Sequence, residues 1–140
     1  MDKMTVFLDT NVLLDQLAQR EGFFADAQII FDLVDSGIIV GIVSSVSIVN
    51  CAYVLPKHYD KNDVLSIIKK LLRMFVVTNV DGKTLEMAAD MLPKDFEDAV
   101  QYISSQAQSP DCIITRDNKG FSDFDVPVLS PKEFVIACKQ

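Results

Sequence analysis

The stretch Val6-Phe7-Leu8-Asp9-Thr10-Asn11 decides the fold, because a short apolar run ends there in three polar residues. Branched and aromatic side chains predict a buried β-strand over residues 4–8, and the apolar run that resumes at Val12 predicts a short helix over 10–18. Ligands of open α/β sheets collect at the carboxyl ends of the strands. Asp9 is therefore a candidate for chemistry, with a plain N-cap of the following helix as the alternative role.

Strands and helices alternate along nearly the whole chain. Further strands are predicted over 38–43, 74–77, 112–115 and 128–129. Helices are predicted over 22–36, from a cap at Ser44 or Ser45 to about Leu55, from a cap at Asp60 or Asn62 to Leu72, and over 84–92 and 95–108. A capping box at Ser130–Glu133, with Pro131 at the first helical position, predicts the last helix. In the helix over 84–92, the residues expected to face inward are Leu85, Ala88, Ala89 and Leu92. This alternation predicts an α/β protein whose parallel sheet is covered by helices on both faces.

The composition is that of a globular domain, with 49% hydrophobic and 24% charged residues in a chain of 140. This length predicts a single domain over residues 1–140. The apolar runs are too short to span a bilayer, and the first residues lack the features of a signal peptide. The three cysteines are widely spaced and form no zinc or disulfide pattern. We expect a cytoplasmic protein without a membrane partner.

Four groups of polar residues interrupt the apolar framework. They are Asp9 with Thr10 and Asn11, Asn50 within an apolar helix, Asp95 with Glu97 and Asp98 at a helix start, and Asp117 with Asn118 after the strand that ends at Thr115. Clustered carboxylates suit Mg²⁺ and similar cations, and a pair of such ions can clamp a phosphodiester and generate the attacking hydroxide. The net charge of −7 disfavours binding of nucleic acid by bulk electrostatics but is compatible with a metal site.

Each group also has a structural explanation. Asp95 is well placed as a helix N-cap, Asp98 to complement the helix dipole, Asp117 to start a turn with Asn118, and Asn50 to bond a neighbouring backbone group. In a parallel sheet Asp9 and Asp117 lie at the same edge. The helix start at 95–98 lies at the opposite edge in the simplest topology, and the pattern does not decide between the two edges.

Other common site types lack their residues. The only histidine, His58, follows Pro56-Lys57 in a predicted turn, so no Ser-His or Cys-His pair is indicated, and the five glycines form no phosphate-binding loop. A phosphatase of the haloacid-dehalogenase type also begins with an aspartate after its first strand, but it needs Asp-x-Asp where this chain has Asn11.

Three segments resemble the motifs of a known family, the PIN domain. Val6-Phe7-Leu8-Asp9-Thr10-Asn11 is similar to its first motif, a hydrophobic strand followed by Asp-x-Asn. Asp95-Phe96-Glu97-Asp98-Ala99 resembles the Asp-Ala motif that opens the catalytic helix, with Asp98 as its acid. Ile113-Ile114-Thr115-Arg116-Asp117, followed by Phe121, is similar to the Thr-x-Asp/Asn strand end. The motifs occur in the family's order and extend over essentially the whole chain.

The resemblance implies a three-layer α/β/α sandwich with a short central parallel sheet, in which the acids converge at the carboxyl edge. Family members are mostly metal-dependent ribonucleases, and many bacterial ones are similar to VapC-type toxins that are paired with an antitoxin. By resemblance, Asp9, Asp98 and Asp117 would be catalytic and would hold Mg²⁺ or Mn²⁺, with Asn50 as a fourth, weak ligand. Asn11 and Thr115 would orient these carboxylates, and Asp95 would add charge beside them. RNA as substrate and a homodimer are also implied.

The chain departs from the family at one position. The second acid of the family is usually a glutamate in the helix after the second strand, and Asn50 occupies the matching position, five residues after Ser45. An amide carbonyl is a neutral ligand, so the site lacks one anionic charge, although some PIN subgroups carry the same Ser-x-x-x-x-Asn pattern. The alternative function is therefore a catalytically weak or inactive PIN-like module that binds RNA or a protein. The basic groups at Lys57, His58 and Lys61 and at Lys69, Lys70 and Arg73 are the first places to look for RNA contacts, or they are simply solvated helix faces.

Overall fold

A computed structural model describes residues 3–117, 120–121 and 124–139. In this part of the chain a sheet of five parallel strands has the order β3-β2-β1-β4-β5. The strands are β1 (Thr5–Leu8), β2 (Val40–Ser44), β3 (Val76–Thr78), β4 (Cys112–Ile114) and β5 (Val128–Leu129). The chain builds outward from β1 to β3 and then returns to the other side of β1. The sheet order therefore reverses between β1 and β4, which is the place where open α/β sheets bind ligands.

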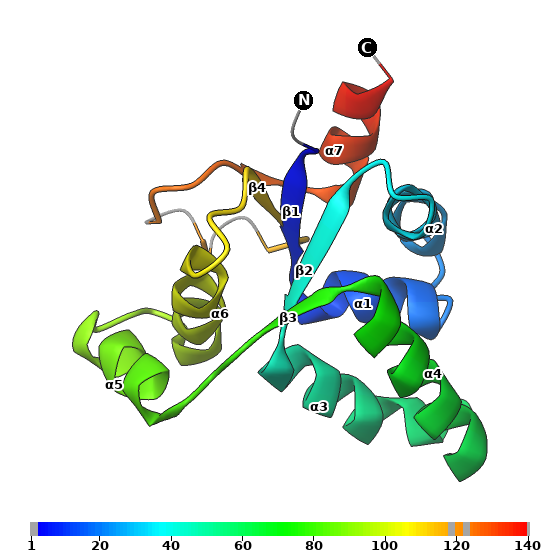
Figure 1. Cartoon of the computed structure of the whole chain (residues 1–140), viewed down its shortest axis with the longest axis horizontal. Coiled ribbons are helices and arrows are strands. Elements are labelled where there is room, and N and C mark those ends of the chain that lie inside the picture. The colour runs from blue at the N-terminus through cyan, green and yellow to red at the C-terminus, as the bar shows by residue number, and fades with distance from the viewer. Residues whose placement is uncertain (1–2, 118–119, 122–123, 140) are drawn as a thin grey trace.

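Helices cover both faces of the sheet, as the alternation of apolar runs predicts. They are α1 (Thr10–Leu17), α2 (Phe24–Asp35), α3 (Ser45–Val54), the 3-10 turn η1 (Leu55–Lys57), α4 (Lys61–Met74), α5 (Gly82–Asp90), α6 (Phe96–Gln106) and α7 (Pro131–Cys138). Figure 1 shows α5 and α6 on one side of the sheet and the remaining helices on the other. The three-layer α/β/α architecture is confirmed. No helix in the described ranges combines the length and the apolar character needed to cross a membrane.

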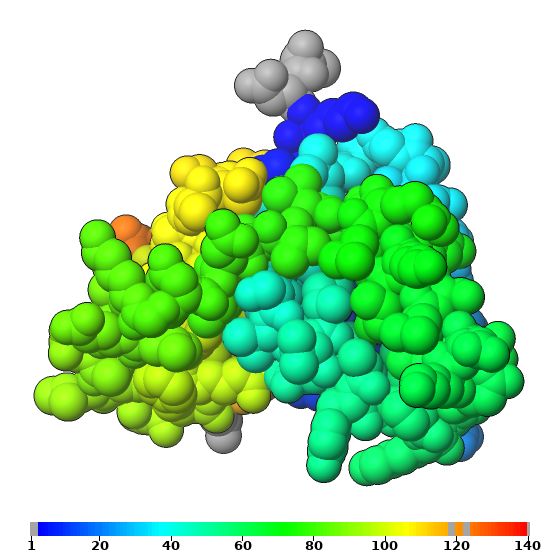
Figure 2. Space-filling model, turned by 60° about the horizontal axis from the view of Figure 1, so that its bottom comes forward, coloured from blue at the N-terminus to red at the C-terminus, as the bar shows by residue number. Residues whose placement is uncertain are grey.

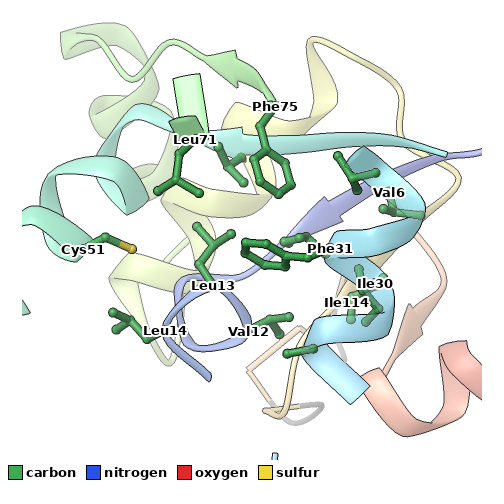
Figure 3. Packing of buried hydrophobic residues seen from close by; sticks show 14 of the residues in the cluster. Val6, Val12, Leu13, Leu14, Ile30, Phe31, Cys51, Leu71, Phe75 and Ile114 are labelled. Atoms are coloured by element: carbon green, nitrogen blue, oxygen red, sulfur yellow. The ribbon is translucent and has the colours of Figure 1, made fainter. Parts of the chain in front are cut away.

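Alternating side chains of the strands pack into two separate hydrophobic cores, one on each face of the sheet. Val6 and Leu8 of β1 belong to the larger cluster, under α1, α2, α3, α4 and α7, whereas Phe7 points to the other face, where it packs with Ile113 and Phe121. In the larger core, Leu13 of α1 lies beside the rings of Phe31 and Phe75 (Figure 3). The central strands are thus buried on both faces, which explains why they read as continuous apolar runs.

Short polar side chains start several of the helices. Ser44, Asp60, Asp81, Asp95 and Ser130 each accept a hydrogen bond from the backbone N–H three residues later. At α7 the predicted capping box is complete, because the Glu133 carboxylate also accepts from the Ser130 N–H at 2.8 Å. The two alternatives left open by the sequence are resolved in favour of Asp60 over Asn62 and of Ser44 over Ser45.

The predicted inward face of the helix over 84–92 is wrong for three of its four residues. Only Ala88 is buried, while Leu85 and Ala89 are exposed. Leu92 is 89% exposed and lies beyond the helix, with a φ of 50°. The physical reason is that Pro93 disfavours helical geometry at the residue before it. In addition, α5 packs mainly on α6 rather than on the sheet, so only a narrow stripe of apolar side chains on α5 is buried.

Gly41 in β2 provides a test of the core packing. A Cβ at this position would lie 2.6 Å from carbons of the Phe75 ring and 2.9 Å from Cγ2 of Val34. We expect Gly41→Ala to lower the free energy of unfolding by about 1–3 kcal/mol, the usual cost of overpacking. Chemical denaturation monitored by circular dichroism measures it.

Gly82 is the matched control, because nothing lies within 4 Å of a Cβ built there. Gly82→Ala at the start of α5 should leave the free energy of unfolding unchanged or raise it by about 0.4–1 kcal/mol. Equal stability losses in the two variants would contradict this account of β2.

Candidate active site

Asp9 and the segment Thr115–Asp117 follow neighbouring strands and meet at the carboxyl edge of the sheet. The Asp9 backbone N–H donates to the Ile114 carbonyl at 3.0 Å, which continues the β1–β4 pairing to the first acid. The Thr115 N–H donates to the Leu129 carbonyl at 2.9 Å, so β5 fixes the end of β4 from its other side. Both groups that the sequence placed at one edge are therefore together, at the point where the strand order reverses.

The Asp9 carboxylate is fixed at both of its oxygens. The Thr115 hydroxyl donates to Oδ2 at 2.8 Å, and the Thr10 backbone N–H donates to Oδ1 at 2.8 Å. The Thr115 hydroxyl oxygen in turn accepts from the Asp117 N–H at 3.0 Å. Asp9 thus caps α1 and also faces the end of β4, so the two roles considered for it coexist. The hydrogen bond from Thr115 to Asp9 is present, and the role of Thr115 in orienting a metal ligand stays a prediction.

The N-terminus of α6 brings Asp98 to the same edge, which answers the topology question that the pattern left open. Asp95 is the N-cap, and its Oδ1 accepts from the Asp98 N–H at 3.0 Å. A Cβ placed on Gly120 would collide with Oδ2 of Asp98 and would lie 3.0 Å from Oδ2 of Asp117. The two carboxylates therefore flank the backbone of Gly120, and position 120 has no room for a side chain.

Asp98 is buried without a donor for one of its oxygens. The residue is 7% exposed, and Oδ2 has no hydrogen-bond partner among the described residues. Burial, together with the charges of Asp95, Asp9, Asp117 and Glu97, raises the pKa of Asp98 to about 7. A bound cation would relieve the electrostatic repulsion between these acids.

The pKa of Asp9 is also raised, chiefly by burial. The hydrogen bonds from Thr115 and Thr10 oppose this rise, and the charges of Glu97 and Asp117 add to it. Glu97 was grouped with the candidate acids but not given a role by the sequence, and it is exposed in the first turn of α6. Negative charges at both the end of β4 and the start of α6 thus raise the pKa of Asp9.

A buried polar cluster behind the acids joins α1, α3 and α6. The Thr10 and Ser47 hydroxyl oxygens are 2.6 Å apart, and the Gln101 amide donates to Thr10 at 3.1 Å and to Ser47 at 2.9 Å. Ser47 lies one turn before Asn50, and Gln101 lies one turn after Asp98. The cluster therefore ties together the three helices that carry Asp9, Asn50 and Asp98. Sequence reasoning missed Ser47 and Gln101, although each is a polar residue one helical turn from a candidate.

Asn50 and Asn11 are less involved than the sequence suggested. Asn50 is half-buried on α3 and Asn11 is exposed on α1, and none of the hydrogen bonds formed among the described residues uses either side-chain amide. The orienting role of Asn11 and the ligand role of Asn50 remain predictions. Asn118, expected to share a turn with Asp117, lies outside the described residues, but Asp117 Oδ1 accepts from the Gly120 N–H at 3.2 Å.

An ion pair that the sequence did not predict links α1 to the end of β4. The Asp15 carboxylate is fully buried and contacts Arg116, with Nε to Oδ2 at 2.8 Å and Nη2 to Oδ1 at 3.1 Å. Arg20 lies 3.7 Å from the same carboxylate. Burial raises the pKa of Asp15, and both arginines counteract that rise. The signal was an acid among the apolar residues of a short helix, because a buried charge requires a partner.

The residues present fit a divalent cation in charge and donor type. Asp9, Asp98 and Asp117 offer carboxylate oxygens at one edge, which suits Mg²⁺ or Mn²⁺. One of these oxygens is buried and has no donor within residues 3–117, 120–121 and 124–139. In the described ranges no three His, Cys, Asp or Glu side chains are already close enough to hold an ion together. Binding would therefore need a small adjustment of these side chains or would keep water in part of the ion's coordination shell.

A model of the PIN domain matches residues 5–119, which include both strand ends and the start of α6. The chain belongs to the PIN domain family. Ribonuclease VapC1 of Aquifex aeolicus (strain VF5) is 29% identical over 140 residues, covering 96% of this chain and 95% of that protein.

Solved PIN-like structures share the fold at low sequence identity. A toxin–antitoxin complex from Klebsiella pneumoniae contains a chain with a TM-score of 0.66 and 18% identity, covering 90% of this chain and 97% of that one. VapC20 of Mycobacterium tuberculosis, a sarcin–ricin loop cleaving toxin, gives a TM-score of 0.64 and 14% identity, covering 84% and 93% of the two chains.

The raised pKa of Asp98 predicts a pH dependence of stability in the metal-free PIN domain. The pKa is 3.8 in the unfolded chain and about 7 in the folded one, so the folded state loses stability on account of Asp98 as the pH rises from about 4 to about 7. Asp98→Asn removes this penalty. We therefore expect the Tm of the variant, relative to wild type, to be more favourable at pH 8 than at pH 5 in EDTA, as measured by differential scanning fluorimetry.

Glu86→Gln is the control, since it removes an exposed acidic charge from α5. Its Tm difference from wild type should change little between the two pH values. A Tm difference for Asp98→Asn that is the same at pH 5 and pH 8 would refute the assignment of this titration to Asp98.

Proposed function

We propose that this protein is a divalent-metal-dependent endoribonuclease that hydrolyses phosphodiester bonds of single-stranded or structured RNA, as the toxin of a toxin–antitoxin pair. The observation that carries the proposal is the buried Oδ2 of Asp98, which has no donor among the described residues and faces Asp117 across Gly120, at the strand edge that also holds Asp9. Membership of the PIN family and the similarity to ribonuclease VapC1 support the same reaction class.

Asp9, Asp98 and Asp117 are the residues that would hold Mg²⁺ or Mn²⁺, with Asn50 as a neutral fourth ligand. When bound, the cation would neutralise the carboxylates, attract the phosphodiester and lower the pKa of the water that attacks phosphorus. The carboxylates are held by different numbers of hydrogen bonds. Asp9 is held by the Thr115 hydroxyl and the Thr10 N–H, whereas Asp117 is exposed and accepts from the Gly120 N–H. Asp9 would therefore set the position of the ion, and Asp117 would adapt to the substrate.

Asp98 would contribute through its lack of hydrogen-bond donors. Each donor on a carboxylate competes with a cation for its lone pairs, and Oδ2 of Asp98 has none among the described residues. Its pKa of about 7 means that protons compete with the metal ion below neutral pH. Asp95 accepts the Asp98 N–H as the cap of α6, and its negative charge beside Asp98 would partly compensate for the charge that the neutral Asn50 does not supply.

A catalytically weak module that binds RNA or a protein is the second candidate. The neutral Asn50 and the absence, among the described residues, of three acids already in metal-binding range favour it. Metal binding distinguishes the two candidates, because a nuclease should gain thermal stability from millimolar Mn²⁺ and a purely structural acidic edge should not.

The proposed partners are an antitoxin protein and a second copy of the chain. The similarity to a chain of the toxin–antitoxin complex from Klebsiella pneumoniae supports an antitoxin. The surface formed by α3 and α4, which face the viewer in Figure 2, exposes the large apolar side chains of Val49, Leu65 and Leu72. Exposed large apolar side chains on neighbouring helices are a common feature of protein interfaces.

Replacing the central acid tests the nuclease. We expect purified wild-type protein to cleave single-stranded RNA in the presence of Mn²⁺ and Asp9→Asn to be slower by at least about 100-fold, because losing a direct ligand costs more than the 10–100-fold typical of groups that orient ligands. Cleavage is followed on denaturing gels with an end-labelled RNA. Glu86→Gln, which leaves the acidic edge intact, should cleave like wild type. Equal cleavage by wild type and Asp9→Asn would identify a contaminating nuclease and refute the proposal.

Restoring the family's acid tests the role of Asn50. Asn50→Glu adds the missing negative charge and should tighten Mn²⁺ binding by about 10-fold, equivalent to about 1.4 kcal/mol, as measured by isothermal titration calorimetry. Asn62→Glu adds the same charge at an exposed position on α4 and should leave the Kd for Mn²⁺ unchanged. If both variants change the Kd equally, general electrostatics rather than a ligand at position 50 is responsible.

A further inference from the structure

A pocket lies beside the acidic edge. It has a volume of about 290 Å³ and is lined by Arg116, which follows β4, by Ser130–Lys132 at the start of α7, and by Phe23 and Asp26 at the start of α2. All three segments follow strand ends or start helices at the carboxyl edge of the sheet. Arg116 is covalently between Thr115, which bonds to Asp9, and Asp117. The pocket therefore adjoins the candidate active site.

Arg116 is held in a fixed position by groups behind it. The buried Asp15 carboxylate pairs with Nε and Nη2, and the guanidinium carbon lies 3.9 Å above the centre of the Phe23 ring. The side chain is nevertheless 28% exposed, so part of the guanidinium remains accessible. A planar cation whose geometry is fixed before binding loses little entropy when it takes up a phosphate.

We propose that this pocket binds one nucleotide of the RNA substrate that flanks the scissile bond, with its phosphate at Arg116 and Lys132 and its base against Phe23. The proposal rests on the proposed function, which supplies RNA as the substrate, and it adds a binding subsite that the acidic residues do not provide. Phe23 is 44% exposed, and exposed aromatic rings paired with cations are a general means of holding single-stranded RNA.

The charge distribution explains why such a subsite is needed. The chain carries a net charge of −7 and its candidate catalytic edge is acidic, so a polyanion is repelled there unless nearby cations hold it. Arg116 and Lys132 place two cationic side chains next to that edge. Asp15 offsets the charge of Arg116, and Arg20, 3.7 Å from Asp15, adds another positive charge. Asp26 also lines the pocket and can accept hydrogen bonds from a base but repels a second phosphate. These groups therefore suit a single nucleotide with one phosphate.

One of the two basic groups singled out in the sequence, Lys69, Lys70 and Arg73, is less suitable. Lys70 and Arg73 lie in the last turns of α4, which leads into the start of β3. They are therefore at the amino edge of the sheet, opposite to Asp9, and with Asp35 they line a different pocket. An RNA strand bound there would not have its phosphodiester at the acidic residues.

Fluorescence anisotropy tests the subsite without cleavage. The probe is a fluorescein-labelled single-stranded RNA of mixed sequence, titrated with full-length protein in low salt with EDTA. We expect Phe23→Ala and Lys132→Ala each to raise the Kd by about 5- to 10-fold, since base stacking and one phosphate contact are each worth a factor of this size. Phe23→Trp and Lys132→Arg, which retain the ring and the charge, should bind within about 2-fold of wild type. Lys69→Ala, which removes a charge from α4, should bind like wild type.

Each outcome separates this proposal from the nuclease assignment. An unchanged Kd in Phe23→Ala and Lys132→Ala, a loss that follows Lys69→Ala instead, or no RNA binding by wild type would overturn the subsite. Loss of affinity in a variant whose Tm has also fallen by many degrees would overturn it as well, unless Phe23→Trp and Lys132→Arg restore binding. Metal-dependent cleavage that is abolished by Asp9→Asn would still establish the nuclease in all these cases. Binding through the pocket without any cleavage would support the subsite and refute the nuclease.

Discussion

The hydrogen bond from the Thr115 hydroxyl to the Asp9 carboxylate is the contact on which the candidate site depends. It joins the ends of β1 and β4, two strands that lie side by side but are 106 residues apart at this contact. The same hydroxyl accepts the Asp117 N–H, so one side chain fixes the first acid and the backbone of the last. Burial makes the contact strong, because a carboxylate removed from water needs its donors. Threonine suits this position because a single hydroxyl both donates and accepts.

Local sequence patterns were sufficient for the strands, most helix caps and the pairing of Asp9 with the end of β4. Continuous apolar runs mark strands buried on both faces, and parallel strands bring their carboxyl ends together. The edge occupied by Asp98 could not be derived this way. A helix start lies at either edge depending on how the preceding segment crosses the sheet, and periodicity carries no information on that path. The motif similarity to PIN domains supplied it, and the contact of Asp98 with Gly120 bears it out.

The residues that the sequence did not reveal act as pairs. Asp15 and Arg116 are 101 positions apart, and Gln101 and Ser47 are 54 apart. The sequence shows each of them only as a polar residue on an apolar helix or strand end, and many partners would satisfy such a group equally well. The predicted burial of Leu92 is wrong for a different, local reason. The helical period was extended to a residue that the following Pro93 excludes from the helix. Hydrophobic periodicity thus does not indicate which distant polar residues pair with each other, nor where a helix ends.

The pairing of β4 with β5 has a consequence for the order in which the molecule is made. The Thr115 N–H finds its acceptor in Leu129, near the C-terminus of this chain and beyond the residues 5–119 that match the family. A nascent chain that has not yet added β5 and α7 leaves β4 as an open edge, with the Thr115 N–H unpaired and Arg116 without the start of α7 beside it. For a protein that we propose cuts RNA, completion of the acidic edge is thereby postponed until β5 has been synthesised.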